Sequence, residues 1–319
     1  MPTIRPMQIA DISHALGLWR TQFICYCLCS SFPPFHDGGE ALIEKYIEQQ
    51  IEKGNAIVAV HNHIVVGYMA WLNFDFHGER TAFLPIIGHA VLSSNEMTIY
   101  AAMYNYASQK WVEDYRFNHL WMTYFDDENM KTGLYELGFG SYVVDACQDT
   151  SKRMEHVRCD YIIEVATPQD IDALLEIANS SNHYYMSSPI FLQRGKQQRP
   201  DIEKILKQCF VLVAKNGNEM VGVMSVSMHE DFNFEQLTTT DSVYIGSLGA
   251  FIYPKYRRKG VGKALLNEIF RICRERGKSH IHVCYKSSNF FASSFWPRYF
   301  KPAIRSVRRT INKDANDVG

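Results

Sequence analysis

Several features that would restrict the function are missing from this sequence of 319 residues. Its apolar runs, such as the one around Ala56–Val60, fall far short of the roughly 20 residues that cross a bilayer. Residues Met1–Arg5 lack the charged start and apolar stretch of a secretory signal. With 19 glycines, 11 prolines and 8 cysteines, neither a low-complexity chain nor a disulfide scaffold is indicated. We therefore expect a globular cytoplasmic protein that does not act in a membrane.

The charge is close to balanced overall but differs between the two halves. Residues 1–155 contain 10 Lys+Arg and 18 Asp+Glu, a net charge of −8, whereas residues 156–319 contain 23 and 16, a net charge of +7. Nine cations lie between Lys255 and Lys278. Such a cluster predicts an anionic partner. Nucleic acid is one candidate, but no RNA-binding motif or zinc-finger spacing accompanies the cations, so a phosphorylated small molecule is favoured.

The same order of predicted elements occurs twice, about 155 residues apart. In the first half a strand, helices and a hairpin around His61–His63 precede a helix over 97–115 and a strand over 118–125. In the second half a strand over Tyr161–Val165, helices and a hairpin around Asn216–Asn218 precede a helix over 262–276 and a strand over 280–285. This pattern predicts an α+β protein with two domains, 1–155 and 156–319.

The segment from Ala250 to Lys263 carries the clearest chemical signal. An apolar strand ends at Pro254, and a basic turn containing Gly260 and Gly262 leads directly into an amphipathic helix. The N–H groups of such a turn converge on an anion, and the N-terminus of the helix adds partial positive charge. The glycine spacing excludes a Rossmann fingerprint and a P-loop. The segment therefore predicts capture of a pyrophosphate.

Two motifs in the second half resemble those of a known family. Arg257-x-x-Gly260-x-Gly262, preceded by Ile252-x-Pro254, resembles the acyl-CoA-binding motif of the GCN5-related N-acetyltransferase (GNAT) superfamily. Asn289-x-x-Ala292-x-x-Phe295-Trp296 resembles the second cofactor motif of that family. The first half resembles a degenerate copy. The resemblance implies two GNAT-like domains, each a mixed, mostly antiparallel sheet with a splayed central strand and flanking helices.

The resemblance also implies acetyl-CoA as co-substrate, with no metal. It places the backbone of Ile252 and the side chain of Asn289 near the pantetheine arm, and the turn around the pyrophosphate. The implied cofactor-binding residues are Ile252, Arg257, Arg258, Lys259, Gly260, Val261, Gly262, Lys263 and Asn289. The implied reaction is direct transfer of an acetyl group to an amine in a ternary complex, with proximity as a main source of rate.

The resemblance leaves the acid and the base undefined. Gly246 and Leu248 stand where the family often has a titratable base, and Trp296 stands where a tyrosine acid is expected. Tyr299 and Tyr244 are the remaining candidates, although a packed tyrosine is the favoured explanation for each of them. We therefore expect catalysis mainly by positioning, with water relaying the proton.

The first half is expected to lack the cofactor. The place for a matching turn is His89–Thr98, which contains no Arg-x-x-Gly-x-Gly and no cation, and Glu96 would oppose a pyrophosphate. This half would shape the acceptor pocket or stabilise the fold. The expected acceptor is a small-molecule amine rather than a protein amino group, with no nucleic acid as partner, and the oligomeric state stays open. A non-catalytic acyl-CoA-binding or sensor protein is the alternative.

Three further patterns allow more than one interpretation. The run Cys25-x-Cys27-x-Cys29 lies in an apolar segment and is interpreted as core cysteines rather than a metal or redox site. His282 and Cys284 share a strand face, but no orienting carboxylate supports an acyl-enzyme. The basic loop Pro189–Pro200 is equally consistent with a mobile surface loop and with an acceptor-binding region.

Overall fold

The computed structural model describes residues 2–29, 39–92, 96–152, 159–228 and 241–316, which form two compact units. The first unit contains the described residues up to Asp145 and those from Pro302 onward, and the second contains those from Ala146 to Lys301. That residues 1–155 and 156–319 form two domains with the same fold stays a prediction. No helix in the described part of the chain is long and apolar enough to cross a bilayer.

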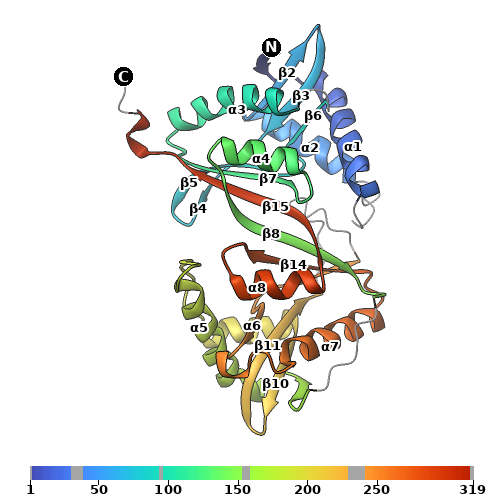
Figure 1. Ribbon diagram of the computed structural model, residues 1–319, viewed down its shortest axis with the longest axis vertical. Coiled ribbons are helices and arrows are strands. Elements are labelled where there is room, and N and C mark those ends of the chain that lie inside the picture. Colours follow the sequence, from blue (N-terminus) through green and yellow to red (C-terminus); the bar gives the residue numbers. More distant parts are fainter. Residues whose placement is uncertain (1, 30–38, 93–95, 153–158, 229–240, 317–319) are drawn as a thin grey trace. The chain divides into compact units, whose positions relative to one another are not determined.

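The first unit combines two groups of strands with four helices (Figure 1). One sheet has the order β1-β2-β3-β6, and the other strands have the order β4-β5-β7-β15-β8. The strands are β1 Thr3–Pro6, β2 Ala56–His61, β3 Ile64–Ala70, β4 Leu72–Phe76, β5 Glu79–Leu84, β6 His89–Val91, β7 Asn118–Tyr124, β8 Gly140–Asp149 and β15 Lys301–Thr310. The helices are α1 Ile12–Cys29, α2 Gly39–Glu52, α3 Glu96–Glu113 and α4 Glu128–Glu136.

The second unit has the strand order β14-β12-β11-β10-β9, with β13 paired to β11. Its strands are β9 Ile162–Val165, β10 Cys209–Asn216, β11 Glu219–Ser227, β12 Ser242–Ile245, β13 Ala250–Ile252 and β14 His280–Lys286. Its helices are α5 Ile171–Met186, α6 Arg199–Gln208, α7 Val261–Glu275 and α8 Phe290–Phe295. In both units most pairings are antiparallel, so the expected mixed, mostly antiparallel sheets are confirmed.

Helices α5 and α7 cover opposite faces of the second sheet (Figure 1). Phe251 packs in the core cluster that contains the apolar residues of α5. The next residue, Ile252, contacts the α7 side, where it lies close to Gly262. Adjacent residues of a strand point to opposite faces, so β13 lies between the two helices.

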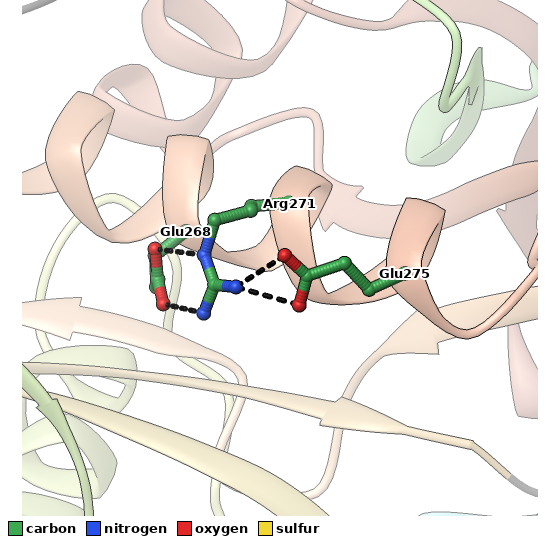
Figure 2. A network of polar contacts seen from close by, with 3 residues as sticks. All are labelled: Glu268, Arg271 and Glu275. Carbon is green, nitrogen blue, oxygen red and sulfur yellow. Dashed lines mark hydrogen bonds and ion pairs between the residues drawn. The ribbon is translucent and has the colours of Figure 1, made fainter.

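Local sequence signals account for the ends of these elements. The β2–β3 turn uses Asn62 and His63, both with positive φ, and the β10–β11 turn uses Gly217 with φ +59°. The carboxylate of Asp11, the residue before α1, accepts the N–H of Gln8 and pairs with Arg5. On the exposed face of α7, Arg271 lies between Glu268 and Glu275 (Figure 2), and its Nε is 2.9 Å from the Glu268 carboxylate. Such pairs one turn apart add modest helix stability.

Candidate active site

The central strand of the second unit divides into two parts. Its first part, β12, runs parallel to β14 and the last pair is Ile245 with Val283. Its second part, β13, pairs only with β11 among the described strands. We call the point where β13 and β14 part the split. The splayed central strand that the fold prediction requires is therefore present here.

A tight bend separates β12 from β13. The N–H of Gly249 donates to the carbonyl of Gly246 (2.9 Å). The buried hydroxyl of Ser225 donates to the same Gly246 carbonyl and accepts the N–H of Leu248 (3.1 Å). Ser225 thus fixes the bend from the neighbouring strand, and nothing in the sequence had indicated this role.

The edge of β13 that faces the split has main-chain groups for a ligand. Ser225 donates its N–H to the carbonyl of Gly249 (2.9 Å). The main-chain N–H and C=O groups of Gly249, and of every second residue after it, therefore point toward β11. Ala250 and Ile252 lie between these positions and turn their N–H and C=O groups away from β11. The role of Ile252 as a backbone contact of the cofactor stays a prediction.

The basic turn after β13 bends sharply before α7. Arg258 has φ +61° and Gly260 has φ +81°, so two residues of three adopt the left-handed conformation. The first helical hydrogen bond runs from the Ala264 N–H to the Gly260 carbonyl (2.9 Å). The N–H groups of Val261 and Gly262 therefore stand outside the helical ladder, at the positive end of the helix dipole. This arrangement can bind an anion.

The cations of the turn have different surroundings. Arg258 and Lys259 are exposed, and Lys263 lies half-buried in the first turn of α7. Lys255 is paired with Glu219 (2.8 Å). Arg257, which was predicted to contact the cofactor, donates from Nε to the Ile252 carbonyl (2.9 Å). Burial lowers the pKa of its guanidinium.

Arg257 lies among aromatic rings contributed by three elements. The centre of its guanidinium is 4.4 Å from the Phe291 ring, 4.9 Å from Tyr184 and 5.6 Å from Phe251. Such contacts attract a cation to the faces of the rings. Arg257 therefore connects β13 to α5 and α8. Its side chain supports the packing of the site in addition to adding positive charge to the turn.

Asn289 is buried and caps the short helix α8. Its Oδ1 accepts the Ala292 N–H (3.2 Å) and the hydroxyl of Tyr184 (3.1 Å). The contact with Tyr184 links residues 105 positions apart in the sequence. Tyr184 was missed by sequence reasoning, because no spacing pattern reports a contact between such distant positions.

The two predicted tyrosines differ in their environments. Tyr244 is half-buried and its hydroxyl contacts the Cys284 Sγ (2.7 Å). The Tyr299 ring packs on Phe295 with centroids 5.0 Å apart, and its hydroxyl forms no hydrogen bond with any described residue. Trp296, at the family's tyrosine position, is buried.

The structure shows the surroundings of several histidine and cysteine residues singled out in the sequence. His282 is buried and its Nε2 is 3.6 Å from the Cys147 Sγ, whereas Cys284 contacts Tyr244. Thus His282 does not activate Cys284. Cys25 is exposed, so its assignment to the core was wrong, and the side chain of Cys29 lies outside the described residues. No group of three potential metal ligands occurs in the described part of the chain.

The basic loop is held against α5. Asn182 donates to the Gly195 carbonyl (2.7 Å), the guanidinium of Arg194 lies 3.6 Å from the centroid of the Tyr185 ring, and Arg199 pairs with Asp172 (2.6 Å). A groove of about 580 Å³ lies beside the same helix. Its lining residues are Glu176, Asn179, Ser180, His183, Tyr184, Ser187, Phe251, Tyr253 and Pro254.

The first unit repeats the main-chain hydrogen bonds of this frame, although Ala70 stands in place of Ser225 and supplies no hydroxyl. Strand β5 runs parallel to β7 up to the pair Leu84 with Trp121, and β6 then pairs with β3. The Gly88 N–H donates to the Pro85 carbonyl (2.8 Å), and the Ala70 N–H donates to the Gly88 carbonyl (2.7 Å). These bonds match those of Gly249, Gly246 and Ser225 in the second unit. His89 therefore occupies the position of Ala250.

Large side chains fill the split of the first unit. The Nε2 of His89 lies 2.7 Å from the Met122 carbonyl on β7 and 3.2 Å from the Nε1 of Trp121. We assign the proton to Nε2 because the Met122 contact is the shorter one and a carbonyl can only accept. The hydroxyl of Tyr100 then donates to Nδ1 (2.8 Å). The rings of His89, Tyr100 and Trp121 contact one another and all three are buried. Burial lowers the pKa of His89 to about 4.

The helices of the two units also correspond. A Cβ on Gly67 would meet Val91 and Ile99, and a Cβ on Gly222 would meet Ile252 and Val261. Ile99 therefore corresponds to Val261.

With Ile99 aligned to Val261, Tyr100 corresponds to Gly262 and Thr98 corresponds to Gly260. Glu96 corresponds to Arg258, and burial and the neighbouring Asp127 raise the pKa of its carboxyl to about 7. Ser93 and Ser94 of the first-half turn lie outside the described residues.

Comparison with known proteins agrees with the geometry. Residues 171–300 match the model of the Acetyltransferase (GNAT) family. This match assigns a GNAT acetyltransferase domain to the second unit and supports acyl transfer as the reaction class. None of the curated proteins matches the chain.

Two solved structures share the fold over nearly the whole chain. A GCN5-related N-acetyltransferase from Sphaerobacter thermophilus is 14% identical, with 97% of this chain and 96% of that chain covered and a TM-score of 0.59. A GCN5-related glucosamine N-acetyltransferase region of a fungal GH3 beta-N-acetylglucosaminidase is 11% identical, with 97% and 38% covered and a TM-score of 0.54. These likenesses show the fold, including that of the first unit.

Proposed function

We propose that the second unit binds acetyl-CoA at the split and transfers the acetyl group to a primary amine, with a small molecule favoured over a protein as acceptor. The observation that carries this proposal is the continuity of the site. The edge of β13 at Ala250 and Ile252, which pairs with no described strand on the side of the split, runs directly into the turn at Gly260 and the start of α7. A pantetheine arm and a pyrophosphate need these two kinds of main-chain site in this order.

In this proposal the residues of the chain bind and orient rather than react. The implied cofactor-binding set is Ile252, Arg257, Arg258, Lys259, Gly260, Val261, Gly262, Lys263 and Asn289. The Ala250 N–H faces the split and can donate to a thioester carbonyl, as an oxyanion-hole donor does. Acetyl-CoA supplies the activated acyl group: the C–S bond breaks, a C–N bond forms, water takes the amine proton and the thiolate is protonated.

Tyr244 and Tyr299 are the proposed candidates for proton transfer to the thiolate. General acids supply roughly 10²–10⁴-fold in rate. Replacement of Tyr299 by Phe is therefore expected to cost less than about tenfold in kcat if positioning and water carry the reaction. A larger loss, with unchanged affinity for acetyl-CoA, would instead identify Tyr299 as the acid.

The first unit is proposed to be a degenerate copy that does not bind acyl-CoA. His89 and Tyr100 fill the split where the second unit has Ala250 and Gly262, and Glu96 replaces a cation. These side chains leave the first unit the roles of stabilising the fold or shaping the acceptor pocket.

The test is calorimetric titration with acetyl-CoA of the wild type, Gly260→Glu and Gly277→Glu. Both glycines have positive φ, +81° and +67°, so both substitutions strain the main chain, but Gly277 follows the far end of α7. One site per chain is expected, with affinity lost by more than tenfold only in Gly260→Glu. Two sites per chain would contradict the account of the first unit, and no binding would contradict the proposed function.

Turnover separates this proposal from a non-catalytic acyl-CoA sensor. Release of CoA thiol is measured with aliphatic amines, amino sugars and lysine peptides. Amino sugars are included because the fungal region of similar fold is a glucosamine N-acetyltransferase. Binding without turnover of any amine would favour the sensor.

A further inference from the structure

Tyr244 crosses the closed end of the split. Its ring lies over Gly246, where an added Cβ would overlap the ring. Its hydroxyl contacts the Sγ of Cys284, the first residue of β14 beyond the last pair of Ile245 with Val283. The ring therefore reaches from one strand to the other at the point where they part.

The main chain beside this ring is held in place. Gly246 is buried, and its carbonyl accepts hydrogen bonds from Gly249 and from the Ser225 hydroxyl. Because the residue under the ring is a glycine, the ring can lie flat along β12 toward the split. Because protein interiors are close-packed, a ligand can occupy the volume of the Tyr244 ring only if the side chain changes its rotamer.

We propose that Tyr244 forms the end wall of the acyl site and restricts the second unit to donors with short acyl groups such as acetyl. The inference rests on the proposed function, because the acyl group reaches Tyr244 only if Ala250 and Ile252 hold the arm that carries it. A hexanoyl group has four more methylenes than acetyl, and these would need the volume that the ring occupies. Tyr244 is thus a specificity-determining residue for the acyl donor.

The test compares the affinities of CoA, acetyl-CoA and hexanoyl-CoA, measured calorimetrically. Wild type is expected to bind acetyl-CoA at least tenfold more tightly than hexanoyl-CoA. Tyr244→Ala and Tyr244→Leu should remove or reverse this preference, because apolar chain buried in the vacated space gains affinity. Tyr244→Phe is the matched control: it keeps the ring and should keep the wild-type ratio. The melting temperature of each variant reports folding.

The outcomes separate this inference from the proposal on which it rests. Failure of the wild type to bind CoA itself would overturn the proposed function. Binding of CoA with equal affinities for acetyl-CoA and hexanoyl-CoA would overturn only the role of Tyr244. An unchanged ratio in folded Tyr244→Ala or Tyr244→Leu would also overturn it. So would a Tyr244→Phe variant that behaves like Tyr244→Ala, because the hydroxyl rather than the ring would then set the preference.

Discussion

Among single residues, the position directly after the bend glycine (Gly88 or Gly249) differs in size and polarity between the units. It holds His89 in the first unit and Ala250 in the second, in frames with the same main-chain hydrogen bonds. The imidazole crosses to the β7 carbonyl of Met122, whereas a methyl group cannot make such a bond.

Exchange of this residue tests that explanation. Ala250→His should place an imidazole across the second split and weaken acetyl-CoA binding by more than tenfold, as measured by calorimetry. Ala250→Ser, which adds only a hydroxyl, should retain binding within about threefold. Equal affinities of Ala250→His and the wild type would show that the split does not hold the donor.

The buried state of His89 predicts a dependence of stability on pH. Its pKa of about 4 in the folded protein lies below the value near 6.5 of an unfolded chain, so the unfolded state binds more protons between these values. Stability should therefore fall as the pH falls from 6.5 toward 4. Between pH 7 and pH 5, His89 alone should cost about 2 kcal/mol in the free energy of unfolding.

The measurement is urea unfolding of wild type and His89→Phe at both pH values. Tryptophan fluorescence follows the first unit well, because four of the five tryptophans lie in it. His119 and His282, whose pKa values burial also lowers, are present in both proteins and do not affect the difference. Equal losses in the two proteins would contradict the assignment to His89.

At the scale of elements, a glycine in the second strand of each hairpin lets the following strand and helix approach. An added Cβ would lie 2.9 Å from the side chain of Val91 at Gly67 and 3.1 Å from that of Ile252 at Gly222. Gly67→Ala and Gly222→Ala should each lower the free energy of unfolding by about 1–3 kcal/mol through overpacking.

Gly17 provides the matched control for these substitutions. It is exposed within α1, and nothing lies within 4 Å of an added Cβ. Gly17→Ala should raise the free energy of unfolding by about 0.5–1 kcal/mol, because alanine favours the helix. Chemical denaturation of the three variants checks both signs. Stabilisation by Gly67→Ala would show that the contact is loose.

The sequence predicted the elements better than their contacts. The turn at Asn216–Asn218 and the basic turn at Gly260 could be found because local conformation depends on a few adjacent residues. The closure by His89 could not be found, since it depends on the register that brings Met122 opposite it. Arg257 was predicted to be near the cofactor by its motif, but its direction is set by rings from α5 and α8. Long-range packing decides such contacts.

At the scale of the whole molecule, the chain crosses between the units more than once. Strand β15 begins at Lys301 in the second unit, and from Pro302 onward it belongs to the first. There it pairs with β7 from Ile304 with Tyr124 to Thr310 with Asn118. Its residues Ala303, Ile304 and Val307 are buried. The last strand therefore completes the core of the first unit.

Truncation after Lys301 tests this assignment. Loss of β15 should lower the urea midpoint of the first unit, followed by tryptophan fluorescence, because three buried apolar side chains and one edge of β7 are lost. A chain that ends at Asn312 keeps β15 and should retain the wild-type midpoint. Equal midpoints for the two truncated chains would show that β15 contributes little.

The position of β15 also affects the order in which the protein is completed during synthesis. Domains generally fold in the order in which they leave the ribosome. Here β7 emerges long before its partner, so one of its edges stays unpaired while the entire second unit is translated. An unpaired strand edge invites pairing with other chains. A premature stop within the final strand would therefore harm the half of the protein that was made first.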